Sequence, residues 1–132
     1  MTTATSYDQV TGRSTDRRRL LRTIITGAMP FDGVMGVVCL AAASQLGDWL
    51  SITAGTVRIT GGVFLVAAVA GAAVLRRGVS DVRPIVAANA VFAAWCLLVL
   101  GLDGPNAIGA ALLAVSALAS AGTAVAEHRL SR

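Results

Sequence analysis

The residues that could do chemistry in this chain are few and widely spaced. They are an aspartate in an otherwise apolar stretch, Asp32, a single histidine, His128, and two cysteines, Cys39 and Cys96. The cysteines form no CxxC pair, so we interpret them as small hydrophobic side chains rather than as a redox couple. One histidine and two thiols cannot assemble a metal site, and no nucleophile stands in a motif with a general base. The sequence therefore predicts no enzyme, no metal and no cofactor.

Composition indicates where these residues lie. Of the 132 residues, 55% are hydrophobic and 14% are charged, which is too apolar for a soluble domain of this size. A bilayer core about 30 Å thick needs a helix of about 20 apolar residues. Four runs reach that length, and each should be helical because backbone polar groups must be paired in lipid. We expect spans at residues 27–47, 56–75, 84–102 and 106–126, within a membrane domain at residues 23–126.

The loops indicate how the spans are arranged. The turn Leu102–Pro105 is so short that the third and fourth spans must be antiparallel neighbours. The sequence thus predicts an all-α four-helix transmembrane bundle of two antiparallel hairpins. Polar residues 1–22 are expected to be a disordered basic segment. Residues 127–132 are expected to be a tail in which Glu127, His128 and Arg129 form a solvated cluster.

Charge predicts the orientation. All eleven basic residues are arginines, and ten of them fall before the first span, between the second and third, or after the fourth. Because arginine-rich short loops stay cytoplasmic, both termini are expected in the cytoplasm, at the inner membrane of a bacterium, with Arg58 alone outside. Trp49 falls where an outer-interface anchor would sit. A signal peptide is rejected, because the first run is longer than a secretory apolar region and contains Pro30 and Asp32.

The arginines next to the spans have two explanations. They enforce topology, which we favour, or they also hold anionic lipid. The residues concerned are Arg17, Arg18, Arg19, Arg22, Arg76 and Arg77.

A shift of 57 residues lays FDGVMGVVCL, from Phe31, over ANAVFAAWCL, from Ala88. The shift places Asp32 on Asn89 and Cys39 on Cys96. It indicates either a parallel repeat of two helical hairpins or a chance match in a biased composition. In both cases Asp32 and Asn89 lie at the same depth, so they form a candidate intramembrane polar pair.

Asp32 has three interpretations. An acid at the centre of a span costs about 2.5 to 3.5 kcal/mol on insertion scales, but Asp32 is expected only about 7 to 8 Å inside the cytoplasmic edge. The favoured role is structural, in which Asp32 pairs with Asn89, Arg76 or Arg83. The alternatives are that it binds protons or a cationic substrate, or that it contacts another subunit.

Small residues at helical spacing predict close helix packing. As dimerisation motifs they are weak, because a chain rich in Ala and Gly produces them by chance. They are Gly36, Ala43 and Gly47 in the first span, Ala67, Ala68, Gly71 and Ala72 in the second, and Ser116, Ala117, Ser120 and Ala121 in the fourth.

Four loose motifs carry a resemblance. They are an arginine-led N-terminus, Asp32 followed by Gly33, Trp49 followed by Leu50, and Ala88 followed by Asn89. On these the chain resembles the short four-span integral membrane proteins of high-GC bacteria, over nearly its whole membrane region. The resemblance implies a fold and no particular activity. The small multidrug resistance transporters are similar in size, but they carry a glutamate deeper in the first span amid more aromatic residues, and this chain has neither feature.

The sequence therefore predicts a small non-enzymatic membrane protein that acts through helix contacts with a second copy or a membrane-protein partner. No nucleic-acid partner is expected. The alternative is a small dimeric secondary transporter with Asp32 and Asn89 in a polar pocket between the hairpins. A deep cavity reaching Asp32 would favour transport, and tight packing around it would favour the structural role.

Overall fold

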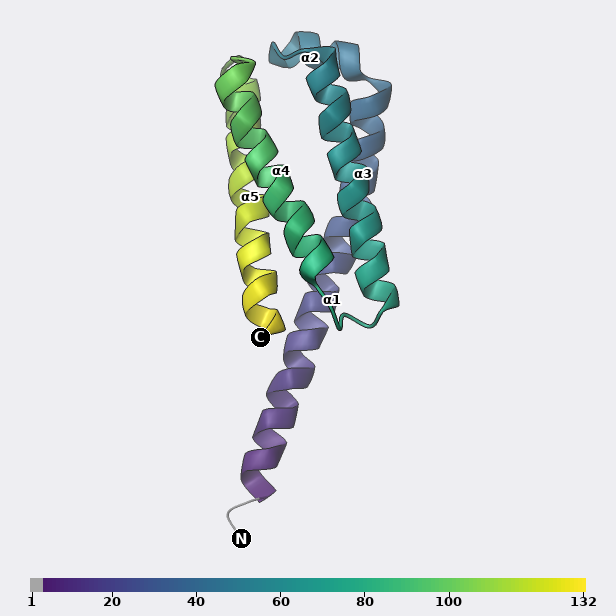
Figure 1. Cartoon of the computed structure of the whole chain (residues 1–132), viewed down its shortest axis with the longest axis vertical. Helices are drawn as coiled ribbons and strands as arrows, with labels where there is room; N and C mark the ends of the chain where they lie inside the picture. The colour runs from purple at the N-terminus through teal and green to yellow at the C-terminus, as the bar shows by residue number, and fades with distance from the viewer. Residues whose placement is uncertain (1–3) are drawn as a thin grey trace.

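Helices make up nearly the whole chain in the computed structural model, which describes the backbone of residues 4–132 and the side chains of residues 12–132. The five helices are α1 (Ala4–Ala41), α2 (Ala43–Leu50), α3 (Ala54–Arg76), α4 (Arg83–Leu102) and α5 (Ala107–Ser131) (Figure 1). Four of them, all but α2, are long and apolar enough to cross a membrane. The predicted all-α, four-span fold is confirmed, and the chain is a small multi-pass membrane protein.

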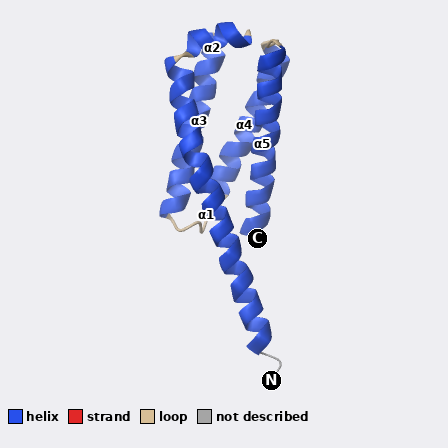
Figure 2. Ribbon diagram, turned by 180° about the vertical axis from the view of Figure 1, so that it is seen from behind, coloured by secondary structure: helices blue, strands red, loops and turns tan. Residues whose placement is uncertain are grey.

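The four long helices form two antiparallel pairs. Helix α1 packs along α3, α4 packs along α5, and α3 and α4 join the pairs. The C-terminal end of α5 and the connection between α3 and α4 lie at the end of the bundle from which α1 projects, while α2 lies at the opposite end (Figures 1 and 2). We call these the basic end and the α2 end.

The first segment differs from the prediction. Residues 1–22 are expected to be disordered, whereas α1 is helical from Ala4; residues 1–3 lie outside the described part. Extending a formed helix is easier than nucleating one, so the apolar span draws the polar residues before it into the same helix. The first span also ends early, because the backbone at Ala42 leaves the helical region (φ −112°, ψ 28°) and α2 turns away. The other predicted spans match within a few residues, except that α5 continues to Ser131.

The backbones of α1 and α3 touch at two glycines. A Cβ atom on Gly61 would lie 2.9 Å from the Gly36 carbonyl oxygen, and one on Gly36 would lie 2.7 Å from Cγ of Leu65. Neither position can hold a side chain without separating the helices. Gly36 belongs to the predicted set of small residues and Gly61 does not. Five more residues of that set are buried, which confirms close packing through them: Ala43, Gly47, Ala67, Gly71 and Ala117. Ala121 is exposed.

Three apolar clusters fill the interior. One at the basic end joins α1, α3 and α4; one beside α2 contains Cys39; and one between the pairs contains Cys96. Phe64 of α3 bridges the pairs, with its ring centroid 4.6 Å from that of Phe92 and 6.4 Å from that of Phe31. Both cysteines are buried among apolar side chains, as predicted, although the internal duplication that aligns them stays a prediction.

The outer surface of the spans is apolar. Val69, Leu102 and Leu118 are 69%, 74% and 75% exposed, and they belong to three different helices. Such a surface is stable against lipid chains and not against water.

Candidate functional site

Three polar side chains from three helices come together near the basic end of the bundle, and we call them the polar cluster. Glu127 of α5 is 1% exposed and is the one buried charged residue among the described side chains. The amide Nδ2 of Asn89, on α4, donates a hydrogen bond of 3.3 Å to its Oε2 atom. Asp32 of α1 is half-buried and lies near enough to interact electrostatically with Glu127. The cluster therefore combines two acids with one amide donor.

Helical periodicity explains why Glu127 faces inward. Helix α5 turns Gly109, Ala117, Ala124 and Glu127 to the interior, with separations close to multiples of 3.6 residues. Asn89 lies six residues after the start of α4 at Arg83, or about 9 Å along the helix axis. The cluster is thus inside the bundle but close to its basic end.

The structure corrects the predicted site at two points. The interpretation of Glu127 as part of a solvated cluster is wrong, although His128 and Arg129 beside it are exposed. Asn89 bonds to Glu127, and no bond between Asn89 and Asp32 is present among the described residues. The signal that could have located Glu127 is the inward face of the fourth span, continued past residue 126.

In the described part of the chain, Asp32 forms no ion pair with the arginines that were predicted as its partners. Arg76 and Arg83 are both exposed, and within residues 12–132 no ion pair joins either of them to Asp32. The backbone N–H of Arg83 donates to Oδ1 of Asp81 at 3.1 Å, so the acid that faces the start of α4 is in the loop. Arg76 is the last residue of α3 and Arg83 is the first residue of α4, and an exposed charged side chain needs no protein partner.

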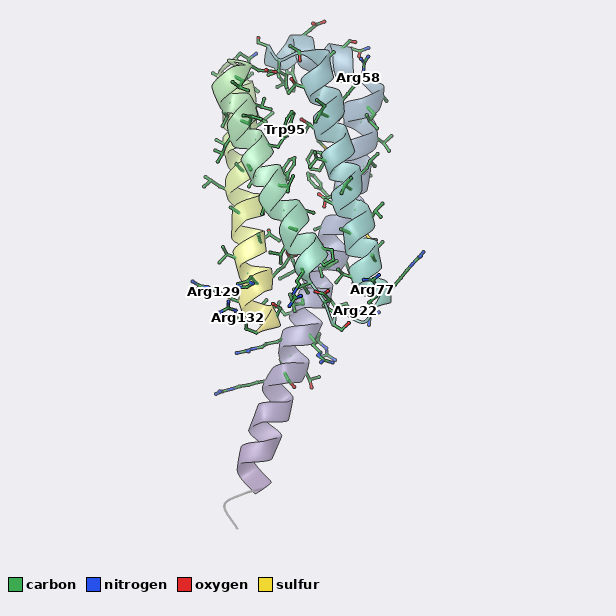
Figure 3. The ribbon with its side chains drawn as sticks, viewed as in Figure 1. Arg22, Arg58, Arg77, Trp95, Arg129 and Arg132 are labelled. Atoms are coloured by element: carbon green, nitrogen blue, oxygen red, sulfur yellow. The ribbon has the colours of Figure 1, made fainter. Side chains whose placement is uncertain are left out.

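The arginines concentrate at the basic end. Figure 3 shows Arg22, Arg77, Arg129 and Arg132 there and Arg58 at the α2 end. The six arginines assigned to topology or lipid are all exposed: Arg17, Arg18, Arg19, Arg22, Arg76 and Arg77. Helix α1 begins and α5 ends at this same end of the bundle (Figure 1), and the side of the membrane on which it lies stays a prediction.

A hydrogen-bonded chain that the sequence analysis missed joins the two pairs nearer the α2 end. Trp95 Nε1 of α4 donates to Thr60 Oγ1 of α3 at 2.8 Å, and Thr60 donates to the Thr56 carbonyl at 2.9 Å. Thr56 Oγ1 then donates to Asp103 Oδ2 at 2.6 Å. These hydrogen bonds satisfy polar groups that lipid could not, and they fix α3 against α4.

Helix α2 is tied to α5 at the same end. Asn106, which caps α5, donates from Nδ2 to the Trp49 carbonyl at 2.7 Å and from its backbone to the Leu50 carbonyl at 3.1 Å. Trp49 is itself exposed, as an interface anchor would be.

Among the described residues, no three His, Cys, Asp or Glu side chains lie where they could hold a metal ion. Thr56 donates its hydroxyl to the Asp103 carboxylate, while the hydroxyls of Thr23, Ser80, Thr123 and Ser131 donate to backbone carbonyls. The polar cluster can hold helices together or exchange a proton or cation between its acids.

No protein-family model, curated protein or solved structure matches this chain.

Proposed function

We propose that this membrane protein acts without catalysis, through contacts of its helices with a second copy of itself or with another membrane protein. The observation that carries the proposal is the outward face of α4. Ala87, Ala90, Ala94 and Gly101 are all exposed there, and a Cβ on Gly101 would meet nothing within 4 Å. Without a hydrophobic force between helices in lipid, small residues favour association because they let two backbones approach closely.

The polar cluster supports the same conclusion. Glu127 is enclosed and hydrogen-bonded by Asn89, and no buried side-chain polar atom among the described residues lacks a partner. The two cavities described at the basic end are lined by neither Asp32, Asn89 nor Glu127. The enclosure of Glu127 and its hydrogen bond to Asn89 support a structural role for Asp32 and its neighbours.

The proposal is tested by substitutions on α4. Replacing Ala90 and Ala94 together with leucine should weaken self-association by about tenfold, because the added side chains hold the helices apart. The measurement is energy transfer between labelled copies in bilayers of known protein density. Leucine at Ala107 and Ala111, exposed alanines four residues apart on α5, is the matched control. Wild-type protein that stays monomeric and recovers no membrane-protein partner after cross-linking would contradict the proposal.

The proposed location is the inner membrane of a bacterium, with both termini cytoplasmic. The support is that ten of the eleven arginines lie in the segments at the basic end. The positive-inside tendency assigns that end to the cytoplasm.

Reporter fusions test the orientation. A phosphatase that is active only outside the cytoplasm should be inactive when fused at Gly78 or after Arg132, and active when inserted at Ser51 in the segment between α2 and α3. A reporter active only in the cytoplasm serves as the complementary control. Activity of the phosphatase at Gly78 would reverse the assignment.

A second candidate function is proton- or cation-coupled transport. It is favoured by one observation, that Asp32, Asn89 and Glu127 converge from three helices, because acids inside membrane spans often form ion pathways. The variant Glu127→Gln distinguishes transport from a purely structural role of the polar cluster.

A further inference from the structure

A basic groove opens at the basic end of the bundle, between the part of α1 that leaves the bundle, the loop after α3 and the last turn of α5. Its volume is about 520 Å³. No Asp or Glu is among its lining residues, which are Arg13, Ser14, Arg17, Arg18, Leu21, Val79, Ser80, Leu130, Ser131 and Arg132.

The walls of this basic groove are cationic. Arg13 and Arg17 stand one turn apart on α1, so their side chains project on the same face. Arg132 contributes a guanidinium from the end of α5. Guanidinium groups bind phosphate oxygens through two parallel hydrogen bonds, so several of them around one groove can hold a phosphate group. The C-terminal end of α5 adds negative charge to this groove, which the four positive charges of Arg13, Arg17, Arg18 and Arg132 outweigh.

The floor of the basic groove is apolar. Leu21 and Val79 are buried, and Leu130 packs against the same cluster. A free phosphate ion gains nothing from such a floor, whereas a phospholipid places its glycerol and first acyl carbons against apolar side chains while its phosphate meets the arginines. The groove lies where α1 passes from its apolar span to its charged segment.

We propose that the basic groove binds the headgroup of an anionic phospholipid. Of the ten arginines at this end, four would contact the headgroup: Arg13, Arg17, Arg18 and Arg132. The remaining arginines act through the surface potential alone. A neighbouring cavity of about 770 Å³ shares Arg132 but is also lined by Asp81, so its charge is mixed and it is not part of the site.

The test compares two triple variants of the full chain with the same net charge. The groove variant replaces Arg13, Arg17 and Arg132 with glutamine. The control variant replaces with glutamine three exposed arginines at the same end that do not line the groove, Arg19, Arg22 and Arg77. Native mass spectrometry of the purified protein in uncharged detergent measures binding of dioleoyl phosphatidylglycerol, with dioleoyl phosphatidylcholine as the zwitterionic comparison.

The groove variant should bind phosphatidylglycerol at least about tenfold more weakly than wild type, and the control variant within about twofold of it. An equal loss in both variants would show that only the surface potential matters and would overturn the proposal. Glycerol 1-phosphate is added as a soluble competitor. Displacement of the lipid by an equal concentration of this competitor would show that the ligand is a free phosphate, which also overturns it.

A conservative variant guards against misfolding. Arg17→Lys keeps the charge and the helix but loses the planar fork, so it should weaken phosphatidylglycerol binding by a few-fold with unchanged thermal unfolding. Unchanged lipid affinity in this variant and in the groove variant would overturn the proposal.

Discussion

Replacing Gly61 with alanine is expected to destabilise the protein by about 1 to 3 kcal/mol, although the exchange raises helix propensity. The added methyl group would lie 2.9 Å from the Gly36 carbonyl oxygen, which belongs to a backbone that cannot rotate away. It would also lie 2.9 Å from Cβ of Cys39, so α1 must move as a whole. The expected result is a lower unfolding temperature in detergent and loss of contact between α1 and α3.

The adjacent glycine is the matched control. A Cβ on Gly62 would meet nothing within 4 Å, so Gly62→Ala gains helix propensity without a clash and should be neutral or stabilising by up to about 1 kcal/mol. The difference between the two variants isolates the helix contact, because the chemical change and the helix are the same. Equal unfolding temperatures for Gly61→Ala and Gly62→Ala would show that α1 and α3 do not cross at Gly36.

Replacing Glu127 with leucine is expected to cost about 1 to 3 kcal/mol, because it leaves the Asn89 amide without its acceptor inside the bundle. Glu127→Gln should stay close to wild type, since its carbonyl oxygen still accepts from Asn89. Thermal unfolding in detergent measures both. Leucine at Ala126, the partly buried neighbour, controls for the added volume at this end of α5.

The same variants decide between the two candidate functions. If the polar cluster is structural, Glu127→Gln preserves both stability and helix association. If the cluster couples ions, Glu127→Gln should abolish proton-coupled flux in reconstituted vesicles as completely as Glu127→Leu does, while its unfolding temperature stays near that of wild type. Such flux in the wild-type protein, eliminated by Glu127→Gln, would replace the proposal of helix contacts with one of transport.

Hydropathy predicted the number of spans and their pairing, because lipid tolerates only long apolar helices and the Leu102–Pro105 turn is too short for any other arrangement. It could not predict that Asn89 bonds to Glu127. The choice of partner depends on how α4 and α5 rotate against each other, and the spacing of apolar residues fixes that rotation poorly when almost every residue is apolar. Glu127 was missed because its charged neighbours His128 and Arg129 resemble a tail, although the inward face of α5 continues through it.

The link between Trp95 and Thr60 was missed for a related reason. Trp95 and Thr60 are each tolerated in a membrane span. They form a hydrogen bond only because α3 and α4 lie side by side at these two residues. The helical start of α1 was missed because composition indicates that the first residues are polar. It does not show that the helix of the following span continues into them. Among the small residues, Gly36 was identified correctly, but its partner Gly61 was not in the predicted set, because the sequence does not show at which residue two helices cross.

The length of α1 has a mechanical consequence. Its 38 residues extend about 57 Å, almost twice the thickness of a bilayer core, so about half of this helix stands outside the apolar layer as a stiff arm. Pro30 interrupts the backbone hydrogen bonds within the half that lies along α3, two residues before Asp32. A sideways force on the outer half would therefore be converted into torque on the inner half, with bending concentrated at Pro30, next to Asp32.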